Sequence, residues 1–394
     1  MTSSVIVAGA RTPIGKFQGA LGGVAAVDLG AVAIREALVR SGVAPEQVDY
    51  VVMGHVIQAG TGQITARQAA VAAGIPKEVP AITINKVCLS GMSAIAMADQ
   101  MIRAGEIEIA VAGGMESMTQ APYLLPKGRE GLRLGHAELV DSMVRDGLWS
   151  SFTKQVMGES SDQVNREVGV SREEQDAWAA RSHQRALAGW ESGALAGEVV
   201  AVEVPQRRPI LVDRDEGIRP DSTADALAAL KPAFAENGTI TAGNASQISD
   251  GAAAVVVASE ERARELHLTP LAEIVSYGMS AERFAYLHTV PAIAMQNALK
   301  KAGLDVHDLA LVEVNEAFAA VAVNVTKLLG VSEDIVNVNG GAVAMGHPIG
   351  ASGARIVLTL AHEIRRRGVL LGGACICGGG GQGDALVLRR RAAD

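Results

Sequence analysis

Residues 88–105 read CLSGMSAIAMADQMIRAG, a cysteine and a run of small residues followed by apolar side chains at helical spacing and a closing glycine. Residues 350–368 read GASGARIVLTLAHEIRRRG and follow the same plan. Each helical pattern begins with Ser-Gly, at Ser90 and Ser352, and the closing glycines are separated by nearly the same distance along the chain as these serines. We therefore expect two homologous halves, each with a helix that starts in a sharp turn and ends at a glycine C-cap.

Short apolar runs alternate with helical patterns on both sides of these segments. Residues 5–7, 50–53 and 107–112 have the length and composition of buried strands. Residues 29–40 carry apolar side chains at helical spacing and stop before Gly42. This alternation is typical of the α/β class and predicts a parallel sheet covered by helices on both faces.

The composition excludes several classes of protein. The 394 residues suffice for two to three domains, and 48% hydrophobic with 20% charged residues exclude a disordered chain. With 35 Lys and Arg against 43 Asp and Glu, the net charge is −8, so the chain lacks the basic field that would bind nucleic acid.

The start of the chain and its apolar runs indicate where the protein acts. Residues 2–9 show neither a secretory nor an organellar leader, and runs such as 252–258 are much shorter than the ~20 residues that span a bilayer. Three cysteines are too few for a disulfide framework. We expect a cytoplasmic protein without a membrane partner.

A segment of different composition separates the two halves. Residues 120–240 are richer in charge and proline and contain a helical stretch at 172–191. We interpret this segment as an inserted domain, which gives an N-terminal half at 1–119 completed by about 241–270, and a C-terminal half at 271–394. The alternative is a separate middle domain with its own core.

Cys88 is the first candidate for chemistry. It follows a strand-like run and precedes a helix, where small residues permit a sharp turn that exposes its side chain. The positive end of the helix dipole is expected to lower the pKa of such a thiol and so raise its thiolate fraction. The alternative is a buried cysteine that packs as a small hydrophobe.

His347 lies in a glycine-dense loop, NGGAVAMGHPIGASG at residues 339–353, ahead of the second-half helix. Glycines allow close backbone approach and positive φ, so the loop can present the imidazole rigidly to a thiol from the equivalent turn of the other half. The alternative is a histidine that caps its own loop.

Two further polar positions follow strand-like runs. Cys377 opens the run CGGGGQG, whose free backbone N–H groups suit a phosphate or an enolate oxygen, although the spacing is not that of a P-loop. Cys375 is expected to be a buried packing residue. Asn315 ends a strand where function gathers in open α/β sheets, and its alternative role is a helix N-cap.

Seven ordered motifs now resemble one family. They are VAGARTPIG from Val7, NKVCLSG from Asn85, AGGMESM from Ala112, GNAS from Gly243, NEAF from Asn315, GHPIG from Gly346 and the glycine run after Cys377. From about residue 4 to residue 389 the chain resembles the thiolases, and among them the bacterial acetyl-CoA C-acetyltransferases. The resemblance implies a five-layered αβαβα fold of two duplicated halves with an inserted loop domain, and a homo-oligomer, either dimer or tetramer.

The resemblance also implies an acyltransferase that condenses two acetyl-CoA to acetoacetyl-CoA and CoA in a reversible Claisen reaction. Cys88 matches the nucleophile that becomes acylated, and Cys377 matches the acid/base for the second acetyl-CoA. His347 matches the base that activates Cys88 and also part of the oxyanion hole. Asn315 matches the holder of an oxyanion-hole water, while the amides of Cys88 and Gly379 match a second oxyanion hole. Neither a metal nor a cofactor is implied, because the CoA thioester is itself the substrate.

The resemblance further assigns coenzyme A contacts to Arg219 and Ser246, and the pantetheine and acyl region to Leu148 and Met157. For Arg219 the alternative is a solvated surface charge. Where many biosynthetic members carry His, this chain has Val156, and residues 284–288 read FAYLH in place of a Gly/Pro-containing segment. These departures leave acyl-chain length open, so a degradative 3-ketoacyl-CoA thiolase for longer chains is one alternative and a catalytically silent acyl-CoA-binding relative another.

Overall fold

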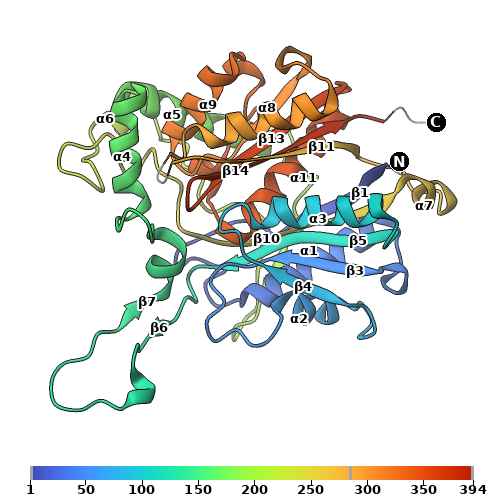
Figure 1. The fold of residues 1–394 in the computed structure, drawn as a ribbon, viewed down its shortest axis with the longest axis horizontal. Coiled ribbons are helices and arrows are strands. Elements are labelled where there is room, and N and C mark those ends of the chain that lie inside the picture. Colours follow the sequence, from blue (N-terminus) through green and yellow to red (C-terminus); the bar gives the residue numbers. More distant parts are fainter. Residues whose placement is uncertain (1–2, 284–285, 392–394) are drawn as a thin grey trace.

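A computed structural model describes residues 3–283 and 286–391. Phe284 and Ala285, part of the FAYLH segment, lie outside the described residues. Two strand layers alternate with three helix layers, with α8 above the upper strands, α3 and α11 in the middle, and α1 and α2 below (Figure 1). The predicted five-layered αβαβα fold is therefore confirmed.

The strands of both layers form one continuous ten-stranded sheet. Its order is β12-β13-β14-β11-β1-β10-β5-β3-β4, with β2 beside β10. The first half supplies β1 (Ser4–Arg11), β2 (Gly15–Lys16), β3 (Tyr50–Gly54), β4 (Ala81–Ile84), β5 (Ile109–Ser117) and β10 (Ser249–Ser259). The second half supplies β11 (Ala272–Ala281), β12 (Leu311–Val314), β13 (Leu371–Gly378) and β14 (Gln382–Arg389).

The helices of the two halves occupy the outer and the middle layers. They are α1 (Ala26–Ser41), α2 (Thr65–Ala72), α3 (Ser90–Ala104), α7 (Glu260–Glu265), α8 (Val290–Ala302), α9 (Ala319–Leu329), α10 (Ala342–Met345) and α11 (Ile349–Arg367). As predicted, α1, α3 and α11 each end at a left-handed glycine C-cap, Gly42, Gly105 and Gly368.

The expectation of a parallel sheet is wrong. Strands β3, β4 and β5 are parallel, as are β12 and β13, but β10, β1, β11 and β14 pair antiparallel to their neighbours. A buried strand reads as an apolar run in either direction when helices cover both faces, so the apolar pattern does not reveal strand direction.

A local pseudo-twofold relates the two central helices. A Cβ atom added to Gly91 of α3 would lie 2.7 Å from the backbone nitrogen of Ala354, and one added to Gly353 of α11 would lie 2.5 Å from that of Met92. The two contacts are equivalent under the internal repeat. Glycine at both positions lets the helix starts touch backbone to backbone, which brings the two turns of interest together.

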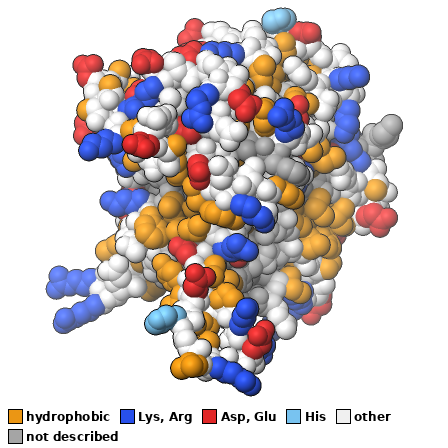
Figure 2. Space-filling view, turned by 60° about the vertical axis from the view of Figure 1, so that its left-hand side comes forward, with side chains coloured by type: hydrophobic (Ala, Val, Ile, Leu, Met, Phe, Trp, Pro, Cys, Tyr) orange, Lys and Arg blue, Asp and Glu red, His pale blue; other side chains and the backbone are white. Residues whose placement is uncertain are grey.

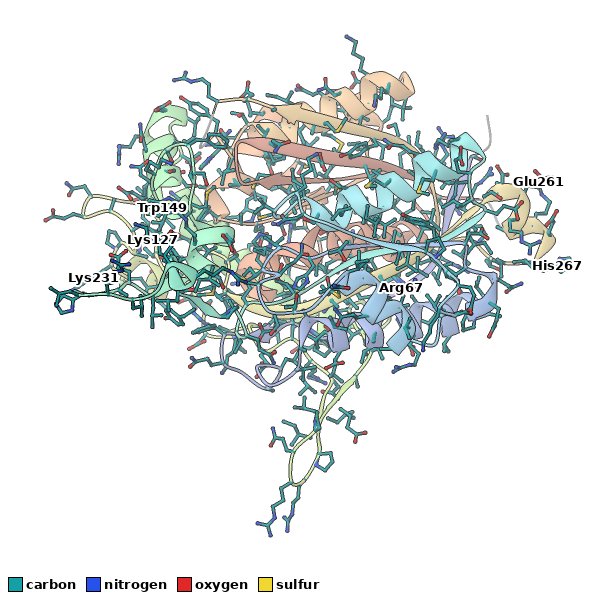
Figure 3. All side chains as sticks on the ribbon, turned by 60° about the horizontal axis from the view of Figure 1, so that its bottom comes forward. Arg67, Lys127, Trp149, Lys231, Glu261 and His267 are labelled. Atoms are coloured by element: carbon teal, nitrogen blue, oxygen red, sulfur yellow. The ribbon has the colours of Figure 1, made fainter. Side chains whose placement is uncertain are left out.

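The inserted segment leaves the sheet after β5 and returns at β10. It contains β6 (Tyr123–Leu124), β7 (Val140–Asp141), α4 (Met157–Val168), α5 (Arg172–Glu191), β8 (Val202–Val204), β9 (Ile210–Val212) and α6 (Ala224–Ala228). Trp178 of α5 belongs to the same core cluster as Phe318 of the second half. In Figure 3, Lys127 and Trp149 of this segment lie on the side of the molecule opposite Glu261.

Candidate active site

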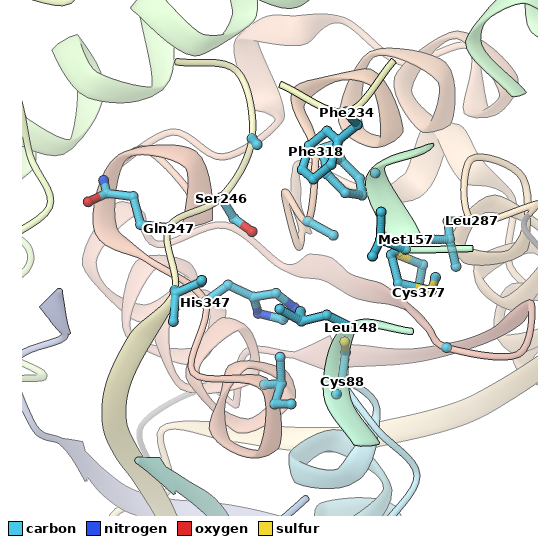
Figure 4. A pocket seen from close by; sticks show the side chains of 18 of the residues that line it. Cys88, Leu148, Met157, Phe234, Ser246, Gln247, Leu287, Phe318, His347 and Cys377 are labelled. Atoms are coloured by element: carbon cyan, nitrogen blue, oxygen red, sulfur yellow. The ribbon is translucent and has the colours of Figure 1, made fainter. Parts of the chain in front are cut away.

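A cavity of about 490 Å³ opens where both halves meet the inserted segment. Cys88 of the first half and His347 and Cys377 of the second all line it (Figure 4). Most of the remaining wall is apolar, with Leu148, Val156, Met157, Phe234, Leu287 and Phe318 among its members. The structure thus brings two sulfur atoms and one imidazole, distant in sequence, into a single apolar chamber.

The turn that carries Cys88 is strained and braced. Val87 has φ +50°, a left-handed conformation that is a genuine outlier for a β-branched residue. Ser90 of α3 secures the turn, because its Oγ accepts the amide of Lys86 at 2.8 Å and donates to the carbonyl oxygen of Val87 at 2.6 Å. The turn points Cys88 into the cavity, where the residue keeps part of its surface accessible.

The thiol of Cys88 is not acidified in this environment. Burial by the cavity walls raises its pKa to about 12, while its own amide and that of Gly379 act in the opposite direction. The expected lowering of the pKa by the helix N-terminus is therefore wrong, because desolvation outweighs the two backbone amides that favour the thiolate. Cys88 is a neutral thiol near pH 7, and its ionisation requires a base.

His347 is oriented by its own helix. Its Nδ1 lies 2.6 Å from the Oγ of Ser352, and that hydroxyl donates its single proton to the carbonyl oxygen of Pro348 at 2.9 Å. With the hydroxyl proton on the carbonyl oxygen of Pro348, Ser352 accepts from Nδ1, and we assign the tautomer in which Nε2 carries no proton. Burial lowers the pKa of the ring to about 3, so the neutral imidazole offers Nε2 as a base. The alternative of a loop-capping histidine and the role of base are both compatible with this bond.

Asn315 lies beside the imidazole rather than in the cavity wall. Its Nδ2 is 3.5 Å from each ring nitrogen of His347, and its Oδ1 is buried without a hydrogen-bond partner among the residues that the structure describes. The alternative role of N-cap is wrong, because Phe318 occupies that position of α9. A buried acceptor without a partner suits a bound water or a polar substrate atom.

Cys377 ends β13 and faces the cavity, with 1% of its surface exposed. Burial raises its pKa well above the ordinary value, and a negative charge on Cys88 would raise it further. The two sulfurs therefore disfavour being ionised together. Gly379 also lines the cavity. Cys375 is fully buried in the core, as predicted.

The predicted coenzyme A contacts separate into two groups. Leu148, Met157 and Ser246 line the cavity. Arg219 does not: its side chain is exposed, and its backbone amide donates to Nδ1 of His183 at 3.0 Å. A role for Arg219 in binding coenzyme A stays a prediction.

Two residues with contacts to this site, Ser352 and Glu116, are not predicted as site residues from the sequence. The sequence marks Ser352 only as a helix start, although it follows His347 by five residues. Glu116 lies in the AGGMESM motif as a carboxylate inside a buried strand, an environment in which an unpaired charge is costly and therefore informative. Its partners come from distant segments and could not be read from the strand itself.

The described residues contain neither a metal-binding cluster nor a membrane-spanning helix. Within residues 3–283 and 286–391, no cluster of three or more His, Cys, Asp and Glu side chains has the arrangement of a metal site. Over the same part of the chain, none of the helices combines the length and the apolar character needed to cross a bilayer.

Comparison with known proteins identifies the family of this chain. The family described as "Thiolase, N-terminal domain" matches residues 4–261, and "Thiolase, C-terminal domain" matches residues 268–390. The chain is 57% identical to a "Probable acetyl-CoA acetyltransferase" of Mycolicibacterium smegmatis, with 98% of this chain and 100% of the relative covered. It is 50% identical to an "Acetyl-CoA acetyltransferase" of Pseudomonas aeruginosa, with 99% and 100% covered. The chain belongs to the thiolase family.

Proposed function

We propose that this protein is an acetyl-CoA acetyltransferase, which condenses two acetyl-CoA into acetoacetyl-CoA and CoA. The convergence of Cys88, His347 and Cys377 in one apolar cavity carries the proposal. The names of the relatives at 50% identity and above support the choice of acetyl-CoA. The CoA thioester acts as substrate, and no additional cofactor enters the proposed reaction.

In the first step Cys88 becomes acetylated. Nε2 of His347 takes the proton from the Cys88 thiol as the sulfur attacks the thioester carbonyl. Cys377 gives its proton to the departing CoA sulfur, which leaves acetyl-Cys88, a His347 imidazolium and a Cys377 thiolate. A water held by the free Oδ1 of Asn315 is placed to stabilise the developing oxyanion.

In the second step the carbon–carbon bond forms. The Cys377 thiolate removes an α-proton from a second acetyl-CoA, and the resulting carbanion attacks the acetyl group on Cys88. Cys88 leaves as a thiolate and recovers its proton from His347, so every group returns to its starting state. An acetylated Cys88 carries no negative charge, so it does not oppose the Cys377 thiolate that removes the α-proton. The amides of Cys88 and Gly379 are placed to stabilise the enolate.

Trapping the acetyl group tests this assignment. Incubation with acetyl-CoA followed by mass spectrometry of peptides is expected to find acetyl on Cys88. Cys377→Ala should still acetylate Cys88 but form no acetoacetyl-CoA, whereas Cys88→Ala should do neither. Turnover by Cys88→Ala at the wild-type rate would refute covalent catalysis through this residue, and absence of turnover in the wild type would favour a silent acyl-CoA-binding relative.

The apolar wall favours a second candidate, a 3-ketoacyl-CoA thiolase for longer chains. Val156 contributes an apolar surface to the cavity where many biosynthetic relatives carry histidine, and Leu287, Phe234 and Phe318 extend that surface. Thiolysis of acetoacetyl-CoA compared with that of 3-ketohexadecanoyl-CoA separates the two candidates. A strong preference for the long substrate would overturn the first choice.

We also propose a homo-oligomer, dimer or tetramer. The arm around β6 and β7 exposes large apolar side chains, namely Tyr123, Leu125, Leu132, Leu134 and Leu139. Figure 2 shows hydrophobic side chains gathered on the face that carries this segment. Exposed apolar surface of this kind is typical of subunit contacts. Light scattering of Leu132→Ser/Leu134→Ser should report a smaller assembly than the wild type, and an unchanged mass would exclude the arm as a contact. A cytoplasmic location stays a prediction.

A further inference from the structure

Glu116 occupies the seam between the two halves, where it bonds to Val56 and Ile57 of the first half and to Gly350 of the second. It lies on β5 of the first half, is fully buried, and receives three backbone N–H groups from two distant segments. We propose that Glu116 is a positioning residue for the condensation, which holds the His347 loop of the second half against the Cys88 half. This inference rests on the proposed function.

The contacts of the carboxylate explain how it positions that loop. Oε2 accepts the amide of Gly350 at 3.0 Å, one of the first-turn amides of α11 that have no partner within the helix. His347 lies just before this turn, so the bond fixes the end of its loop. The backbone of Gly350 also packs tightly on Gly114 of β5, where even a methyl group would collide with it.

The same carboxylate fixes a wall on the side of Cys88. Oε2 also accepts the amide of Val56 at 3.1 Å, and Oε1 accepts that of Ile57 at 3.1 Å. Val56 and Ile57 belong to the apolar cluster that packs against Cys88. One side chain therefore sets the position of the base and of the nucleophile's surroundings at once, although it lines neither the cavity nor the substrate path.

The charge of Glu116 has the opposite effect on the nucleophile. Its negative charge contributes to the raised pKa of Cys88. The titratable groups that face the carboxylate are the neutral His55, whose Nε2 lies 3.4 Å away, Asp250 and Cys88 itself. Burial raises the pKa of Glu116 to about 7. The residue thus aids catalysis by its geometry while its charge hinders ionisation of the thiol.

These opposed effects separate a positioning role from a structural one. Glu116→Gln keeps the size and shape of the side chain. It removes the negative charge and replaces one of the two oxygens that accept backbone N–H groups. We expect the rate of acetoacetyl-CoA formation to fall by roughly tenfold or more, since small misplacements of reacting groups are costly. We expect alkylation of Cys88 by iodoacetamide, followed on its peptide, to become faster at neutral pH, because the thiol pKa falls. A purely structural defect would lower the melting temperature and turnover without shifting the pH profile of Cys88 alkylation to lower pH.

Glu313→Gln is the matched control. Glu313 is an equally buried carboxylate on β12, paired with Arg355 at 3.5 Å, and it acts on Cys375 rather than on Cys88. Its substitution should leave alkylation of Cys88 unchanged. Glu116→Asp is the second variant. It keeps the negative charge, but its shorter side chain moves the carboxylate away from the amide of Gly350. Turnover should therefore fall, while alkylation of Cys88 should not become faster.

The outcomes separate this inference from the proposed function. Wild-type turnover in both Glu116 variants would overturn the positioning role while acetylation of Cys88 still supported the reaction. Slower or unchanged alkylation in folded Glu116→Gln would overturn the electrostatic part. If Glu116→Gln fails to fold, Glu116→Asp decides alone through its turnover. Failure of wild-type Cys88 to become acetylated would instead remove the proposed function.

Discussion

The starts of α3 and α11 are equivalent in the internal repeat, yet they serve different purposes. Ser90 at the start of α3 forms both of its hydrogen bonds with backbone atoms, and these bonds stabilise the strained Val87 ahead of Cys88. Ser352 at the start of α11 accepts the Nδ1 proton of His347 and so selects the tautomer of a side chain. One duplicated position thus supports a backbone turn in the first half and proton chemistry in the second.

The two starts also differ in how they meet the cavity. Cys88 keeps accessible surface, whereas His347 is 6% exposed and Asn315 is fully buried. In the proposed reaction, the first half therefore presents the atom that substrate reaches, and the second half encloses it with the base His347 and with Asn315. A duplicated fold can divide a reaction in this way because the pseudo-twofold brings both turns to the same place.

Removal of the His347 imidazole should reduce turnover more than any other substitution considered below. His347→Asn keeps a polar side chain of similar size but no base, and turnover should fall by about 10²- to 10⁴-fold. Because the pKa of His347 is lowered to about 3, the basic form predominates at every pH above that value. The loss should therefore be the same one pH unit below and one pH unit above neutrality, in kcat measured with acetyl-CoA. A wild-type rate in the variant would show that the second half does not supply the base.

Substitution of Ser352 should mainly affect turnover, whereas substitution of Ser90 should mainly affect stability. Ser352→Ala frees the Nδ1 proton and lets the ring adopt the wrong tautomer, so we expect turnover to fall by roughly 10- to 100-fold with little change in melting temperature. Ser90→Ala leaves the amide of Lys86 without its acceptor, which should reduce the free energy of unfolding by about 1–3 kcal/mol. Kinetics and chemical denaturation of both variants check the contrast. Equal kinetic losses would end the distinction between the two starts.

Much of this comparison could be predicted from the sequence, because it is local. The glycine C-caps are short-range signals, so the sequence predicts where α3 and α11 end and where α3 begins, but α11 begins at Ile349, three residues before the predicted start at Ser352. The turn before Cys88 and the glycine-dense loop of His347 were likewise visible, and the structure places both side chains in one cavity.

The features that could not be predicted depend on contacts with residues that are far away in the sequence. The pKa of Cys88 is set by burial among walls from other segments, which no local pattern reports. The exposure of Arg219 and the bonds of Glu116 across the seam likewise arise only when the halves assemble. The antiparallel strands were missed because strand direction leaves no mark on a strand buried on both faces.

Gly91 and Gly353 make equivalent contacts between α3 and α11, and their substitution tests whether the two contacts contribute equally to the free energy of unfolding. Gly91→Ala and Gly353→Ala each place a methyl group against a backbone nitrogen, at 2.7 and 2.5 Å. Backbone atoms cannot yield cheaply, so each change should lower the free energy of unfolding by about 1–3 kcal/mol and by similar amounts. Gly23→Ala is the control, since nothing lies within 4 Å of its added methyl group. Urea titration of all three variants measures the effect, and a harmless Gly91→Ala or Gly353→Ala would break the symmetry.

The smallest expected effect on the free energy of unfolding comes from the strained backbone of Val87 in the first half. Val87→Gly relieves a left-handed β-branched residue, worth about 1–2 kcal/mol, but it also frees the unfolded chain, which costs about 0.5–1 kcal/mol. The free energy of unfolding should therefore change by about 1 kcal/mol or less in urea titration. The brace from Ser90 remains in this variant, so Cys88 should still point into the cavity and become acetylated. A large loss of acetylation without a loss of stability would instead mean that the side chain of Val87, which also lines the cavity, holds the thiol in place through packing rather than through the backbone.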